Sequence, residues 1–65
     1  GERLPGGEAQ CREAALLLKL DRPEEARAAL EEVERRLKRI DRHERTRESD
    51  MYNWAMKELA QLRGN

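Results

Sequence analysis

The apolar residues of the chain fall into three segments with helical spacing. The first, residues 8–20, is rich in alanine and leucine and has Glu8 in its opening turn, where the helix dipole favours an acidic side chain. The second carries a seam whose members alternate in steps of four and three: Ala26, Leu30, Val33, Leu37 and Ile40. The third places five apolar residues on one face: Met51, Trp54, Ala55, Leu59 and Leu62. We therefore predict helices at about 8–20, 23–42 and 48–63, preceded by a flexible segment, residues 1–7, with three glycines and a proline.

The first two helices meet at a short turn around Pro23. A proline disfavours the α conformation in the residue before it, here Arg22, and fits the first turn of a new helix. Asp21 can cap that helix, and Glu24, three residues on, can complete a capping box. These signals predict a helical hairpin.

Residues 41–50 contain no apolar side chain, and extending the seam of the second helix places Glu44 and Arg47 where leucines would stand. Residues 24–63 contain neither glycine nor proline, so no residue forces a break. Either the chain turns near residues 43–49 and a third helix begins, or one helix runs on for about 60 Å at 1.5 Å per residue. We predict the turn, because Thr46, Ser49 and Asp50 suit helix caps better than helix interiors.

The composition supports an all-α fold. Sixty-five residues make one small domain, 43% of them are charged, and few favour strands. The expected architecture is a helical hairpin plus a third, C-terminal helix, either a small bundle or a coiled-coil-like assembly that a second chain would complete. No apolar run approaches the roughly 20 residues that span a bilayer, and the lone Cys11 fits a reducing compartment, so we expect a cytoplasmic protein.

A run of leucines at the end of the first helix indicates a protein-binding surface. Four leucines within residues 16–20 point in nearly all directions around the axis, and one neighbouring helix covers only one stripe of them. Aromatic residues are common in interfaces, and both aromatic residues lie in the last segment, where Trp54 could equally close the core of this chain. The predicted function is a protein–protein interaction module, an adaptor, subunit or stoichiometric regulator that binds another protein, a second copy, or both. The predicted contact residues are Leu16, Leu17, Leu18, Leu20, Met51, Tyr52, Trp54 and Leu62.

The charges balance in number, at 14 basic and 14 acidic, but not in position. Residues 24–34 carry a net charge of −4 and residues 35–48 a net charge of +4. Two antiparallel helices could match these blocks, or the charges could pair within one helix, as Glu31 with Arg35, Glu32 with Arg36 and Glu34 with Lys38.

The alternative function is a small nucleic-acid-binding factor that uses the basic stretch. Its expected phosphate contacts are Arg35, Arg36, Lys38, Arg39 and Arg42. The neutral total charge and the absence of an aromatic residue from this stretch favour the protein-binding interpretation.

The sequence offers little for catalysis. His43 and Cys11 are the only soft metal ligands, whereas a zinc site needs about four ligands. Cys11 shares a helical face with Ala14 and Leu18, which predicts a small buried residue, and His43 lies in a charged, solvated stretch. We therefore expect neither an enzyme nor a bound cofactor or metal.

Residues 13–30, EAALLLKLDRPEEARAAL, resemble the middle of a tetratricopeptide repeat. The resemblance assigns Ala14 and Ala26 to the small positions that pack together across the hairpin, and Leu17 and Leu30 to the larger packing positions. The usual aromatic residue of the first helix, the glycine before the turn and a second repeat are absent, and a solenoid needs about three repeats. The resemblance implies a helical hairpin and a peptide- or helix-binding role.

Overall fold

The computed structural model describes residues 7–64, which form four helices and no strand. The helices are α1 (Glu8–Lys19), α2 (Pro23–Leu37), α3 (Arg42–Arg47) and α4 (Ser49–Gly64). The predicted all-α fold, a hairpin followed by a C-terminal helix, is confirmed. Of the predicted flexible segment, residues 1–6 lie outside the described residues, and Gly7 is buried.

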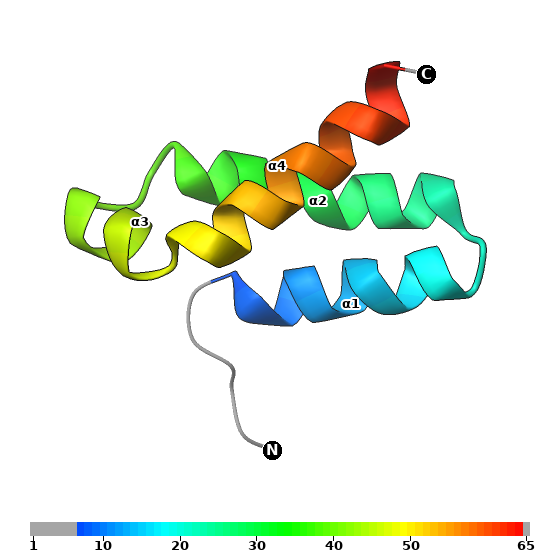
Figure 1. The fold of residues 1–65 in the computed structure, drawn as a ribbon, viewed down its shortest axis with the longest axis horizontal. Helices are drawn as coiled ribbons and strands as arrows, with labels where there is room; N and C mark the ends of the chain where they lie inside the picture. Colours follow the sequence, from blue (N-terminus) through cyan, green and yellow to red (C-terminus); the bar gives the residue numbers. More distant parts are fainter. Residues whose placement is uncertain (1–6, 65) are drawn as a thin grey trace.

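Helices α1 and α2 form an antiparallel hairpin (Figure 1). The turn between them closes with two hydrogen bonds, from the Arg22 amide to the Leu17 carbonyl (2.9 Å) and from the Asp21 amide to the Leu18 carbonyl (3.2 Å). This is the Schellman arrangement, in which the residue after the helix adopts a left-handed conformation, and Asp21 does so with φ of 58°. The predicted capping box is therefore wrong: Arg22 occupies the N-cap of α2, and no side chain caps that helix.

Helix α2 ends at Leu37, five residues before its predicted end, and the chain turns at residues 38–41 rather than at 43–49. Two side chains explain the earlier turn. Asp41 caps α3 by accepting a 2.8 Å hydrogen bond from the Glu44 amide, and Arg45 Nη2 donates a 2.9 Å hydrogen bond to the Leu37 carbonyl at the end of α2. The short helix α3 follows, and the alternative of one uninterrupted helix is wrong.

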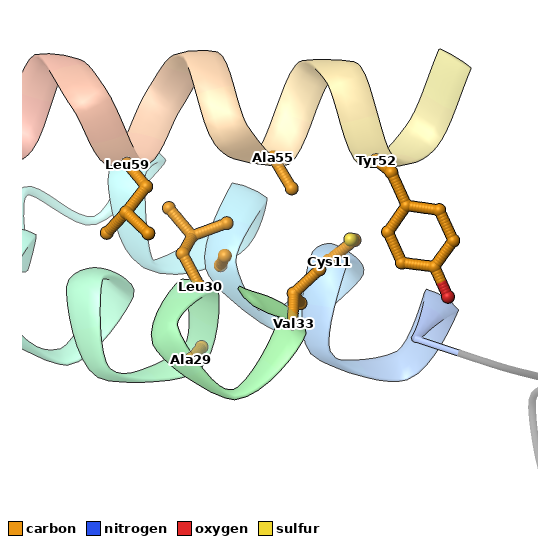
Figure 2. Packing of buried hydrophobic residues seen from close by; sticks show 8 residues of the cluster. Cys11, Ala29, Leu30, Val33, Tyr52, Ala55 and Leu59 are labelled. Atoms are coloured by element: carbon orange, nitrogen blue, oxygen red, sulfur yellow. The ribbon is translucent and has the colours of Figure 1, made fainter. Parts of the chain in front are cut away.

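Helix α4 lies across the hairpin, mainly against α2 (Figure 1). In the core, Leu59 and Ala55 of α4 face Leu30 and Val33 of α2, with Cys11 of α1 beside them (Figure 2). The α2 seam is confirmed, since Ala26, Leu30 and Val33 are buried, and Leu37 and Ile40, partly buried, pack against the core. The outermost residues of the seam are less covered because α4 crosses α2 at an angle.

Helices α1 and α4 are close only where both begin, and they diverge towards their C-terminal ends (Figure 1). The second half of α1 therefore has one neighbouring helix instead of two. This geometry leaves part of the leucine run outside the core, which determines the surface described next.

Candidate interaction surface

The four leucines at the end of α1 separate into two pairs. Leu17 and Leu18 are half-buried, whereas Leu16 and Leu20 are each 56% exposed and are the exposed large hydrophobic residues of the described chain. Leu16 and Leu20 are one helical turn apart and therefore point the same way, away from α2. We call these two side chains the leucine face.

A shallow apolar groove lies where α1 and α4 approach each other. Cys11 and Ala15 line it from α1, and Met51 and Trp54 line it from α4. Charged side chains stand around it: Glu8, Arg12 and Glu48. The structure thus brings Met51 and Trp54 beside α1, but on the side of the helix next to the leucine face and not on the face itself. Leu62, near the end of α4, is partly buried against the core.

Tyr52, also among the predicted contact residues, lies in the core with 2% of its surface exposed. Its hydroxyl donates a 2.9 Å hydrogen bond to Oε2 of Glu44, and Nη2 of Arg36 donates to the same oxygen at 2.9 Å. Burial, and next the hydrogen bond to Glu44, raise the pKa of the phenol. We leave Tyr52 out of the candidate surface, because its ring and its hydroxyl are both occupied within the chain. The sequence signal for this contact is the seam position of Glu44, where a leucine was expected.

Cys11 is 6% exposed, as its helical position predicts. Burial, and then the nearby charge of Glu8, raise the pKa of its thiol, so the reactive thiolate is disfavoured. His43 is exposed on α3. Within residues 7–64, no three histidine, cysteine or acidic side chains are grouped so as to hold a metal ion.

The acidic side chains of α2 reach α4 instead of their neighbours on α2. Arg63 donates hydrogen bonds to Glu34 (2.9 Å) and Glu31 (3.3 Å), and Arg27 also contacts Glu31. These hydrogen bonds, from Arg63 first, lower the pKa of both carboxyl groups. The predicted pairs of Glu31 with Arg35, Glu32 with Arg36 and Glu34 with Lys38 do not form, because partners outside the expected spacing compete successfully.

Two of the predicted phosphate contacts are already engaged within the chain. Arg35 forms an ion pair with Glu32, and Arg36 forms one with Glu44. The other three, Lys38, Arg39 and Arg42, are exposed at the end of α2 and the start of α3.

Comparisons of this chain with protein-family models, with curated proteins and with solved structures found no match. The resemblance to a tetratricopeptide hairpin therefore stays a prediction. Ala14 and Ala26, the positions that it pairs across the hairpin, are both fully buried. No helix within residues 7–64 is long and apolar enough to cross a membrane.

Proposed function

We propose that this protein is a small helical interaction module that binds a partner protein through the leucine face of α1. The observation that carries the proposal is the position of Leu16 and Leu20, which are more than half exposed, stand side by side, and lie outside the hydrophobic core. Single exposed leucines are common on folded proteins, whereas adjacent ones on one helix form an apolar patch that a partner can bury. Both residues point away from the neighbouring helices, so repacking within the chain does not cover them.

The partner that suits this surface is an amphipathic helix. Apolar residues one turn apart are the usual contact points when one helix packs along another. Arg12 and Lys19 are both exposed and, seven residues apart, stand on the same flank of the leucine face. A partner helix with acidic residues on the matching side would complement these cations. An antiparallel second copy would instead bring the cationic flanks of both chains together, so we propose a different protein as the partner.

Site-specific photo-crosslinking tests the proposal in the source cells. A photoreactive amino acid is placed at position 16 or 20, with position 28 on α2 as the control, because Ala28 is exposed on the other helix of the hairpin. We expect a discrete adduct with one protein from positions 16 and 20 and not from position 28. Equal adducts from all three positions, or adducts with a second copy alone, would overturn the proposal.

Direct binding to the crosslinked protein then completes the test. Leu16→Asp and Leu20→Asp should each weaken binding at least tenfold, because a buried charge replaces an apolar contact, whereas the matched Ala28→Asp should leave the affinity unchanged. Binding should depend weakly on salt, since apolar packing releases few counterions. An affinity that Leu16→Asp and Leu20→Asp do not change would contradict the assignment of the leucine face.

A further inference from the structure

A second surface, at the opposite end of the hairpin from the α1–α2 turn, carries a concentration of positive charge. Five exposed cations lie in the turn after α2 and on α3, and we call them the basic end: Lys38, Arg39, Arg42, Arg45 and Arg47. None of the five forms an ion pair with another described residue, whereas six arginines elsewhere in residues 7–64 do so. The basic end therefore holds most of the uncompensated cations of the described chain.

The acidic residues within the same stretch have other partners or positions. Glu44 accepts hydrogen bonds from Arg36 and Tyr52, and the Asp41 carboxylate caps α3. Glu48 is half-buried at the rim of the groove between α1 and α4. Residues 36–48 together carry a net charge of +3, which the other residues of the neutral chain balance from a distance.

The side chains around these cations indicate which polyanion they suit. The basic end includes no aromatic residue, so single-stranded bases have no platform for stacking. The one large apolar residue in this stretch, Ile40, packs against the core, which leaves no apolar side chain to enter a lipid surface. Arginine guanidinium groups bind phosphates through paired hydrogen bonds, and three of the five cations are arginines on α3.

We propose that the basic end binds the phosphate backbone of double-stranded nucleic acid without reading its sequence. The contact uses electrostatic attraction and counterion release, which depend on the number of phosphates neutralised and not on the bases. This surface is separate from the leucine face, so the proposal stands or fails independently of the proposed protein partner.

Fluorescence anisotropy with a short labelled duplex of mixed sequence tests the proposal. Neutralising three cations in Lys38→Gln, Arg39→Gln and Arg42→Gln together should weaken binding at low salt by about tenfold or more and make the log–log salt slope shallower by about 2.7, at about 0.9 per lost phosphate contact. The control neutralises three exposed cations elsewhere, Arg22→Gln, Arg27→Gln and Lys57→Gln, and should retain most of the affinity. Circular dichroism establishes that both triple variants keep their helices.

Three results would overturn the proposal. The first is no binding of the duplex to the unaltered protein at low salt. The second is an equal loss in the control variant, because net charge rather than the basic end would then govern binding. The third is displacement of the duplex by anionic lipid vesicles at equal phosphate concentration, which would identify a lipid surface as the preferred polyanion.

Discussion

The hydroxyl of Tyr52 donates a 2.9 Å hydrogen bond to Oε2 of Glu44, and this contact joins the core of α4 to the short helix α3. Arg36 of α2 donates to the same oxygen, so one carboxylate links three helices. Gly7, just before α1, completes the site: a Cβ there would lie 3.6 Å from the Tyr52 ring and 3.4 Å from the Arg36 side chain. Helix α3 buries none of its residues and therefore depends on this contact for its position.

Replacing Tyr52 with phenylalanine tests that dependence. Tyr52→Phe should lower the free energy of unfolding by about 1 kcal/mol, the usual net value of one hydrogen bond, with more if Glu44 is left poorly solvated. Because the native phenol has a raised pKa, its stabilising effect is complete below about pH 10 and is lost as pH rises through the native value. Urea unfolding should therefore show a stability difference between the two proteins that shrinks in alkali. A difference that does not vary between pH 7 and pH 11 would contradict this account.

Asp21 is the place where a glycine should improve the fold. Its φ of 58° lies in the left-handed region, which costs a residue with a Cβ more than it costs glycine. Asp21→Gly should raise the free energy of unfolding by about 0.5–1 kcal/mol after the added entropy of the unfolded chain is included.

The neighbouring residue supplies the control for that measurement. Arg22 has φ of −120°, which any residue adopts, so Arg22→Gly should destabilise the protein, because glycine only adds freedom to the unfolded chain there. Thermal unfolding of both variants checks the pair of signs. If Asp21→Gly were the less stable variant, the left-handed turn would not be the conformation in solution.

The contact between Arg63 and the acidic side chains of α2 should appear in the acid limb of the stability profile. The pKa values of Glu31 and Glu34 are lowered, so their contribution is present above about pH 4.3, the value for an unfolded chain, and is lost as pH falls through the native values. Arg63→Gln should be less stable than the unaltered protein at pH 7, and the difference should disappear in strong acid. Lys57→Gln removes the same charge from α4 without an ion pair among the described residues, and should leave the acid profile unchanged.

The features that the sequence predicted correctly depend on local patterns. Pro23 and the steps of four and three along α2 require only neighbouring residues, and both the hairpin and the buried seam follow from them. The end of α2 depends instead on contacts across the turn, where Arg45 reaches the Leu37 carbonyl and Asp41 caps the next helix. Such contacts have no periodic signal in the sequence.

The candidate surface shows the same division. The leucine run predicts that one helix cannot cover all its members, and the structure separates Leu16 and Leu20 from their half-buried neighbours. Tyr52 could not be assigned from its own segment, because its burial depends on Glu44, eight residues away on another helix. Glu34 likewise bonds to Arg63, 29 residues away, and not to the lysine at the favoured helical spacing.

The thiol of Cys11 should react slowly in the folded protein. It is buried, and its raised pKa keeps the thiolate fraction small at neutral pH. A chromogenic disulfide reagent should label the native protein far more slowly than the same protein in urea at the same pH. Labelling at equal rates would mean that the groove between α1 and α4 opens to solvent at Cys11.

The leucines of this small domain should divide sharply by their effect on stability. Leu30 is fully buried, so Leu30→Ala should cost about 2–5 kcal/mol, comparable to the whole stability of a domain of this size, and leave the protein largely unfolded. Leu16→Ala and Leu20→Ala remove side chains that are more than half exposed and substitute a good helix former, so each should change the free energy of unfolding by about 0.5 kcal/mol or less.

Urea titrations followed by circular dichroism measure all three variants, and the two exposed positions decide the interpretation of the leucine face. A residue kept for binding loses little when it is replaced in the free protein, since its contacts are made only in the complex. If Leu16→Ala or Leu20→Ala cost more than about 1 kcal/mol, the leucine would be supporting the fold of the free chain. The leucine face would then not be available to a partner, and the proposed function would lose the observation that carries it.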